Sequence, residues 1–396
     1  MKIAMFTNNY KPYVGGVPIS IEHLAEALRA QGHQVYIFAP SYKNQKEEED
    51  VIRYPSFPLS IVGAPIPNVL TGLFEQKVRE LQIDVIHVHH PALVGNVALA
   101  LQKKYGIPVV FTYHTRYEQY LHYVKPLEIF EHYTGAVERY LRWFSGRCDL
   151  LLAPTPGIKK YLETIPMDTP VAVLPTGIPE KNFMPDEARA ADIRRQNIGN
   201  ADYLFCTVAR LAKEKNLDFQ LEGLANLKEH LGEKGKTFRY MMIGDGPERE
   251  HIEKLAKNLG LEENVILTGN ISNDEIAVYQ KACDAFLFSS KSETQGIVLL
   301  EAMAVGNPVV AVEASGVSDV VENGKNGYLT KEDPKVWAER IFNMVLQPAT
   351  FEQMRIQAKQ TAEAYSEAEI ARKAANDYFN AWMSRKEILH PVPFYQ

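Results

Sequence analysis

Residues 289–311, SSKSETQGIVLLEAMAVGNPVVA, are the stretch from which we predict the fold of this 396-residue chain. An apolar run, AFLFSS, leads into the stretch and predicts a buried strand, and GIVLLEAMAVG then predicts a helix that Gly306 ends. Glu293 stands just before that helix, and Glu301 is expected about two turns into it. A buried strand that leads directly into a helix is typical of α/β proteins with a parallel sheet.

The start of this predicted helix is a candidate anion site. The backbone amides of Gln295, Gly296 and Ile297 and the helix dipole favour a bound diphosphate there, with one carboxylate on each side. The alternative is that Glu293 is an ordinary charge at a helix start and that Glu301 is a solvated helix residue. The spacing of two glutamates does not decide between these interpretations.

A second segment, VARLAKEKN, favours the binding interpretation. It predicts a strand that ends at Arg210 and a short turn that leads to Lys215. In an open α/β sheet the carboxyl ends of the strands border the ligand-binding crevice. A guanidinium fork and an ammonium group there could neutralise a departing diphosphate without a bound metal ion. As isolated loop residues, both would be solvated charges.

The alternation of strands and helices divides the chain into two series, and its length also favours two domains. The predicted strands are KIAMFTN, QVYIFAP, DVIHVHH, PVVFTYH, DLLLAPT and VAVLPTG in the first series, and YLFCTVAR, FRYMMIGDG, NVILTGN, AFLFSS and PVVAV in the second. Residues 175–200 are rich in proline, glycine and charge and mark the predicted boundary. We therefore expect domains at 1–180 and 200–365, with 366–396 forming a C-terminal helix and tail.

The composition, with 46% hydrophobic and 23% charged residues, is ordinary for a globular protein. The apolar run at the N-terminus is too short for a signal peptide, and no segment approaches the roughly 18 apolar residues that span a bilayer. We expect a cytoplasmic protein whose membrane contact is peripheral. The net charge of -6 lies in the second half, because residues 1–180 carry 17 basic and 17 acidic side chains. Neither half is typical of a nucleic-acid binder.

The second half resembles the donor domain of the retaining glycosyltransferases of family 4, which have the GT-B fold. The resemblance covers roughly residues 200–330 and rests on VARLAKEKN, MMIGDGPERE, NVILTGNIS, the two glutamates of the first segment and the sequel GVSDVVENGKNGYL. It implies an α/β fold of two Rossmann-like domains facing a central cleft, with a C-terminal helix that returns to the N-terminal domain. It also implies transfer of a hexose from a nucleotide sugar with retention of configuration, without a metal ion or a cofactor.

The donor-binding residues of the family carry over position by position. Arg210 and Lys215 would bind the diphosphate, Glu293 the hydroxyl groups of the transferred sugar, and Glu301 the ribose hydroxyls. The further positions that the resemblance assigns to the donor are Gly244 and Gly246, beside the nucleotide, and Ile271, near the base.

The first half contributes a glycine turn and a histidine. Gly15 and Gly16 lie between the first predicted strand and the first predicted helix, in a loop that faces the phosphate and the sugar in the family. A glycine pair is equally compatible with a plain turn, since no complete GxGxxG is present. His114 ends a later predicted strand and is the candidate to contact the sugar or the reacting centre. A structural histidine is the alternative.

Residues 113–144 are unusually aromatic. The nine aromatic residues are Tyr113, Tyr117, Tyr120, Tyr123, Phe130, Tyr133, Tyr140, Trp143 and Phe144, and basic residues are interleaved with them. Amphipathic rings with basic neighbours suit the headgroup region of a bilayer. The candidate acceptor and membrane residues are therefore Arg116, Tyr117, Tyr120, Tyr123, Lys125, Arg139, Arg142 and Trp143. The alternative is an aromatic-rich pair of helices packed on the sheet.

Residues 114–124, HTRYEQYLHYV, also resemble the corresponding stretch of bacterial diacylglycerol glucosyltransferases. That subgroup implies transfer of glucose from UDP-glucose to the free hydroxyl of 1,2-diacylglycerol, by a protein that lies peripherally on the inner face of the cell membrane. The neutral first half argues against strong electrostatic attachment. The alternatives are a family 4 enzyme with a soluble sugar or polysaccharide acceptor, a nucleotide-sugar epimerase of GT-B shape, and a non-catalytic nucleotide- or lipid-binding protein.

Overall fold

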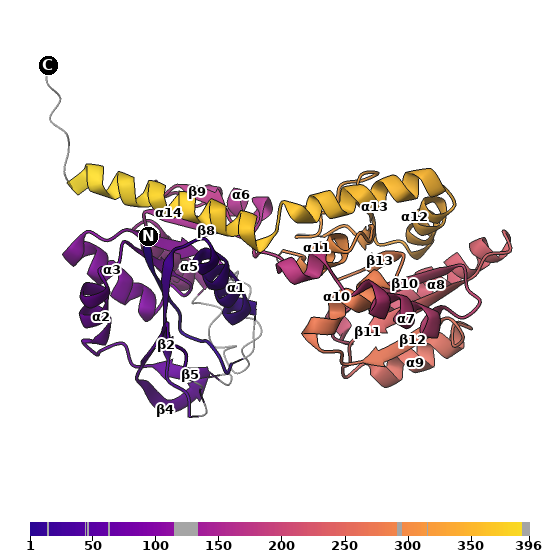
Figure 1. The fold of residues 1–396 in the computed structure, drawn as a ribbon, viewed down its shortest axis with the longest axis horizontal. Helices are drawn as coiled ribbons and strands as arrows, with labels where there is room; N and C mark the ends of the chain where they lie inside the picture. The colour runs from indigo at the N-terminus through magenta and orange to yellow at the C-terminus, as the bar shows by residue number, and fades with distance from the viewer. Residues whose placement is uncertain are drawn as a thin grey trace, which may run out of the picture. The chain divides into compact units, whose positions relative to one another are not determined.

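The structure is a computed structural model that describes residues 1–13, 16–43, 45, 47–61, 64–114, 134–290, 295–314 and 316–389. The chain forms two compact units, which Figure 1 shows as separate groups of helices and strands. The first unit comprises Met1–Gly177 together with the C-terminal segment from Glu367, and the second comprises Ile178–Ser366.

The segment that the sequence pattern leaves between the domains belongs to the second unit. It forms the short 3-10 helix η3 (Glu180–Phe183) and helix α7 (Glu187–Ile198). Helix α7 is rich in charge, and its buried residues are Ala190 and Ile193. So small an apolar face gives little periodic signal in the sequence.

The first unit is built on a seven-stranded parallel sheet with strand order β3-β2-β1-β6-β7-β8-β9. Its strands are β1 (Lys2–Phe6), β2 (Gln34–Pro40), β3 (Val51–Tyr54), β6 (Val85–Val88), β7 (Val109–Thr112), β8 (Leu150–Ala153) and β9 (Val171–Val173). Strands β6, β7 and β8 are buried at every residue, as expected of a parallel sheet with both faces covered. An antiparallel hairpin of β4 (Ser56–Ile61) and β5 (Ala64–Pro67) lies outside this sheet.

Helices cover both faces of this sheet. One face carries α1 (Gly16–Ala30) and α14 (Glu367–Leu389), which contact each other and share an apolar core with β1 and β2. The other face carries α2 (Leu73–Leu81), α3 (Val94–Tyr105), α5 (Thr134–Ser145) and α6 (Pro156–Thr164). The prediction that the C-terminal helix returns to the N-terminal domain is therefore confirmed.

A buried hydrogen bond ties helix α14 to the centre of the sheet. The hydroxyl of Tyr378 lies 2.8 Å from Nδ1 of His87 on β6, and both side chains are fully buried. The other ring nitrogen of His87 lies 2.6 Å from Oγ1 of Thr112 on β7. The last helix is thus bonded to a strand that lies 291 positions earlier in the chain.

The second unit is a six-stranded parallel sheet with strand order β12-β11-β10-β13-β14-β15. Its strands are β10 (Tyr203–Val208), β11 (Phe238–Ile243), β12 (Val265–Gly269), β13 (Ala285–Phe288), β14 (Val309–Val312) and β15 (Gly327–Thr330). Strands β10 and β13 are neighbours in the sheet, and the sequence order reverses between them. This reversal is the place where open α/β sheets bind ligands.

Two apolar cores flank the second sheet. Helices α8 (Leu217–Gly232), α9 (Arg249–Asn258) and α12 (Pro334–Val345) contribute to one, and α7, α10 (Asn273–Lys281), α11 (Ile297–Ala304) and α13 (Pro348–Glu363) to the other. Helices α8 and α12 approach closely at Gly223, where a Cβ atom would lie only 2.5 Å from the ring of Trp337. A side chain at this position would force the two helices apart.

The strands predicted from the two alternating series are all present, and the predicted class of two Rossmann-like α/β domains is confirmed. The sequence pattern does not predict β3, β4, β5 and β15. Prolines at positions 55, 58, 65 and 67 interrupt the apolar pattern in the region of the hairpin. None of the helices in the described ranges is long and apolar enough to cross a membrane.

We expect Tyr378→Phe to destabilise the first unit by about 1–3 kcal/mol, because it leaves Nδ1 of the buried His87 without a partner. Chemical denaturation followed by circular dichroism would measure the change. Phe379→Leu is the matched control, since Phe379 is the next residue of α14 and is 50% exposed. An unchanged midpoint for Tyr378→Phe would show that the hydrogen bond does not hold the helix.

Candidate functional site

A pocket of about 420 Å³ in the second unit gathers most of the predicted donor residues. Its lining residues are Val208, Ala209, Arg210, Lys215, Phe288, Gln295, Gly296, Ile297, Val298 and Glu301. They come from the carboxyl ends of β10 and β13, which pair directly, and from the first turns of α11. Two cations, one carboxyl group and one helix start therefore share one concave surface.

The two cations stand on the loop that follows β10. Arg210 lies two residues beyond the strand, is two-thirds exposed, and forms an ion pair of 2.7 Å with Glu214. Lys215 is half-buried at the end of the short 3-10 helix η4 (Lys213–Lys215). An exposed pair of this kind is weakly held, so the guanidinium of Arg210 can turn to an anionic ligand at little cost.

Buried hydrogen bonds hold the backbone of this loop. Oγ of Ser289, directly after β13, lies 2.8 Å from the carbonyl oxygen of Lys215 and 2.9 Å from that of Asn216. Nε2 of Gln220 donates to Ser289, and the hydroxyl of Tyr240 donates to Oε1 of Gln220. Sequence reasoning missed this network, because SS after a strand and a glutamine in a helix carry no recognisable pattern. Its effect is to fix where Lys215 stands.

The start of α11 has the geometry of an anion site. Gly296 is the N-cap at φ 68°, and a Cβ atom there would lie 3.1 Å from the carbonyl oxygen of Gly316. Gln295 is buried, and the chain enters the helix along the pocket wall, which Gln295, Gly296 and Ile297 line. The helix begins at Ile297, which puts Glu301 little more than one turn from its start. The expected two turns are wrong by most of a turn.

Glu301 is a titratable group of this pocket whose pKa is shifted. Burial raises its pKa from 4.5 to about 7. The carboxyl group therefore changes charge near neutral pH, and it can bind hydroxyl groups as a carboxylate or as a neutral acid. Helix α11 ends at Ala304, and Gly306, predicted to end it, lies two residues further on at φ 87°. Glu293 lies outside the described residues.

Gly244 and Gly246 lie directly against the backbone of the loop that contains Arg210. A Cβ atom at Gly244, whose φ is 137°, would lie 2.1 Å from the carbonyl oxygen of Ala209, and one at Gly246 would lie 2.3 Å from that of Leu211. The glycines thus let the end of β11 press against the backbone on both sides of Arg210. Ile271 packs partly buried against the core after β12 and is not among the pocket's lining residues.

In the first unit the candidate residues follow β1 and β7, which lie on either side of β6, and the strand order reverses between β1 and β6. His114 follows β7 and is half-buried, and its Nε2 lies 2.8 Å from Nδ1 of His89, which follows β6 and is 1% exposed. Burial lowers the pKa of His114 to about 3 and holds the pKa of His89 well below 6.5. Both imidazoles are therefore neutral at physiological pH. Gly16 begins α1 in open space, and Gly15 lies outside the described residues.

A third histidine at this edge has a defined proton position. The backbone N–H of Asn8, after β1, donates to Nδ1 of His90 over 3.1 Å. Burial lowers the pKa of His90 to about 4, so the neutral ring carries its proton on Nε2. Sequence reasoning selected only His114. The run HVHH was visible at a strand end, but nothing in it tells which ring meets which.

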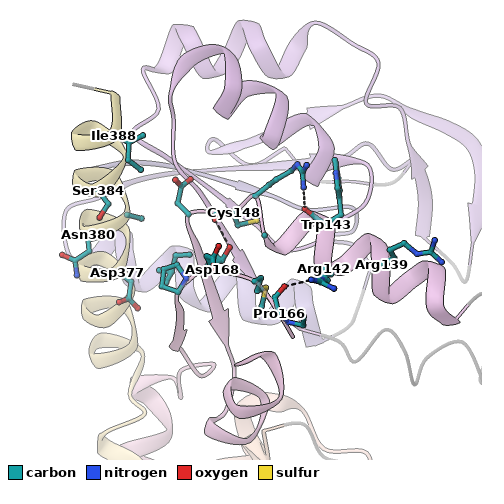
Figure 2. Close-up of a pocket in the computed structure, with 18 residues that line it drawn as sticks. Arg139, Arg142, Trp143, Cys148, Pro166, Asp168, Asp377, Asn380, Ser384 and Ile388 are labelled. Atoms are coloured by element: carbon teal, nitrogen blue, oxygen red, sulfur yellow. Dashed lines mark hydrogen bonds between the residues drawn. The ribbon is translucent and has the colours of Figure 1, made fainter. Parts of the chain in front are cut away.

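Three of the predicted acceptor and membrane residues lie at the other edge of the first sheet. Arg139, Arg142 and Trp143 line a cavity of about 870 Å³ between α5 and α14, shown in Figure 2. Helix α5 ends where β8 begins, so this cavity borders the amino ends of the strands, whereas His114 follows a carboxyl end. Nε of Arg142 donates to the carbonyl oxygen of Pro166. Trp143 is 43% exposed.

Two aromatic residues of the 113–144 segment belong to the hydrophobic core. Tyr113 is 2% exposed and Phe144 is fully buried, so the alternative of aromatic residues packed on the sheet holds for these two. The other predicted members of the acceptor set, Arg116, Tyr117, Tyr120, Tyr123 and Lys125, lie outside the described residues.

Two family models match the chain, one in each half. Residues 14–182 match the model described as glycosyltransferase family 4, and residues 188–361 match the model described as glycosyl transferases group 1. Together they extend over every strand of the two parallel sheets except β1, and over the pocket that contains Arg210 and Glu301.

Similarity to named relatives extends over most of the chain. It is 30% identical over 342 residues to the alpha-monoglucosyldiacylglycerol synthase of Acholeplasma laidlawii, with coverage of 83% of this chain and 84% of the relative. It is 32% identical over 319 residues to the enzyme of the same name from Streptococcus pneumoniae, with coverage of 78% and 71%. Among solved structures, Anabaena HepE in complex with UDP is similar in fold, with a TM-score of 0.73, 18% identity, and coverage of 96% of this chain and 100% of that chain.

We expect Glu301→Gln to flatten the pH dependence of the second unit's stability. Because folding raises the pKa of Glu301, the native protein holds a proton that the unfolded chain releases, and stability falls as pH rises from about 4.5 to above 7. The difference in the free energy of unfolding between variant and parent protein should therefore shift by about 1–3 kcal/mol in favour of the variant as pH rises from 5 to 8. Urea unfolding at both pH values measures this.

The exposed Glu339→Gln is the matched control and should follow the parent protein at both pH values. Parallel pH profiles of stability for Glu301→Gln and Glu339→Gln would contradict a partly buried Glu301 that holds a proton.

Proposed function

The chain belongs to the family 4 glycosyltransferases of GT-B fold, and we propose that it transfers glucose from UDP-glucose to the free hydroxyl of 1,2-diacylglycerol with retention of anomeric configuration. The convergence of Arg210, Lys215, Glu301 and the start of α11 on one pocket carries this proposal. The proposed reaction needs a nucleotide-sugar donor, a lipid acceptor, and no cofactor or metal ion.

In the proposed donor complex the diphosphate lies against the start of α11. The amides of Gln295, Gly296 and Ile297 donate to its oxygens, and the ammonium of Lys215 and the guanidinium of Arg210 neutralise its charge. Glu301 accepts hydrogen bonds from the ribose hydroxyls as a carboxylate, and ligand binding therefore lowers its pKa from the raised value of the free protein. Glu293 is assigned to the hydroxyls of the transferred glucose.

The cations act mainly on the transition state. Negative charge on the leaving diphosphate grows as the bond to the anomeric carbon lengthens, so groups that neutralise it stabilise the transition state more than the bound donor. Retention is assigned to attack of the acceptor hydroxyl on the face from which UDP departs. His114, neutral because of its burial, is assigned to a hydrogen bond with the sugar or the reacting oxygen.

A lipid acceptor is supported by the relatives, which are named as synthases of alpha-monoglucosyldiacylglycerol. We propose that the protein is cytoplasmic and lies peripherally on the inner face of the cell membrane. The exposed ring of Trp143 and the guanidinium of Arg139 suit contact with lipid headgroups. Because they border the amino ends of the strands, they are assigned to membrane contact and not to the reacting hydroxyl.

We expect Arg210→Ala to lower kcat about 10²-fold at saturating donor, with a smaller change in donor KM. Lys213→Ala is the matched control: it removes an exposed cation of the same loop that is not among the pocket's lining residues, and its kcat should stay within about twofold. Steady-state kinetics with each variant measures both parameters. Equal kcat for Arg210→Ala and the parent protein would refute the assignment to the leaving group.

The function itself is tested by the product. Purified protein is incubated with labelled UDP-glucose, UDP-galactose or GDP-mannose, with phosphatidylcholine vesicles that do or do not contain diacylglycerol. We expect an α-glucosyl diacylglycerol, formed only from UDP-glucose and only on the diacylglycerol vesicles. Transfer to a soluble sugar without vesicles, interconversion of the donor without lipid, or nucleotide binding without turnover would each replace the proposal with the corresponding alternative.

A further inference from the structure

His89 and His114 share a single hydrogen bond between two neutral rings. Nδ1 of His89 lies 2.8 Å from Nε2 of His114, and the ring centroids are 5.1 Å apart at an interplanar angle of 23°. Burial lowers the pKa of both histidines far below neutrality. A neutral imidazole has one N–H and one bare nitrogen, so only one of the two facing nitrogens can carry the proton of this bond.

The surroundings of His89 decide between the two arrangements. Its other ring nitrogen, Nε2, is buried and has no hydrogen-bond partner among the described residues. If His114 were the donor, the proton of His89 would have to sit on that Nε2 as a buried, unpaired N–H. If His89 donates from Nδ1, only a bare acceptor is left unpaired, which costs less than an orphaned donor.

The ring of His89 also packs against a neighbouring ring whose two nitrogens are both hydrogen-bonded. Its centroid is 4.1 Å from that of His87, which is fixed by the hydroxyl of Tyr378 on one side and by Oγ1 of Thr112 on the other. A flip of His89 would bring a carbon atom into the place of Nδ1 and leave His114 without its bond. The proton position is therefore built into the packing of β6, β7 and α14.

We propose that His89 is a positioning residue: it donates from Nδ1 to Nε2 of His114, and so keeps the proton of His114 on Nδ1 as a hydrogen-bond donor for the substrate. In the described part of the chain, no residue forms a hydrogen bond with Nδ1 of His114. His114 can then donate to a sugar hydroxyl or to an oxygen that gains negative charge, and Nδ1 cannot accept a proton. The substrate part of this inference rests on the proposed glycosyl transfer, and the proton position does not.

The proton position is tested without turnover. Protein labelled with ¹⁵N-histidine is examined at pH 7 by long-range ¹H–¹⁵N correlation, which separates protonated from bare ring nitrogens, and the His114 signals are assigned by their loss in His114→Gln. We expect His114 to carry its proton on Nδ1 and His89 to carry its proton on Nδ1. A proton on Nε2 of His114 would overturn the inference, whatever reaction the protein catalyses.

The functional part is tested with a pair of variants. His89→Phe keeps a flat ring beside His87 but has no donor, whereas the amide nitrogen of His89→Asn can take the place of Nδ1. We expect His89→Phe to lower kcat about 10- to 100-fold with donor KM within about twofold, and His89→Asn to recover to within about fivefold of the parent protein. A merely structural histidine predicts that the smaller Asn does no better than Phe, and that result would overturn the positioning role. If the parent protein transfers no sugar, the proposed function fails while the spectrum still decides the proton position.

Discussion

Direct pairing of β10 with β13 is the constraint on which the donor pocket depends. In the parallel register Phe205 lies beside Ala285 and Cys206 beside Phe286, although the two strands are far apart in the sequence. The loop after β10 and the helix after β13 therefore begin at one edge of the sheet. Ser289 then forms hydrogen bonds across that edge to the backbone of the loop. These bonds hold the two cations of the loop close to the start of the helix, so that all three line one pocket.

The candidate residues of the two units differ in their charge: those of the second unit are charged, and the histidines of the first unit are neutral. The second unit offers exposed or half-buried charges, which can follow a ligand because weak ion pairs such as that of Arg210 with Glu214 hold them only loosely. The first unit offers neutral imidazoles, buried for His89 and half-buried for His114, which can act through the direction of a hydrogen bond and not through charge. Mobile charge suits a group that leaves with a growing negative charge, and a fixed donor suits a partner whose position must not vary.

The sequence was sufficient for the fold class, for the strands of both sheets that carry long apolar runs, and for the cluster of Arg210, Lys215, Glu301 and the start of α11. These features depend on periodicity and on the common edge of parallel strands. It was insufficient for the clamp at Ser289, for the meeting of His89 with His114, and for the close approach at Gly244. Each of these depends on side-chain directions and on contacts between distant segments. Local sequence patterns do not report either of them.

The attachment of α14 has a consequence for the order in which the chain is synthesised. Residues 1–177 leave the ribosome first, but the face that they share with Ile370, Ala374 and Tyr378 stays uncovered until the whole of the second unit has been translated. During that interval the nascent chain exposes apolar surface of β1 and α1, and a chaperone is the natural temporary cover. A chain truncated before Glu367 would leave this apolar face permanently uncovered and would be prone to aggregate.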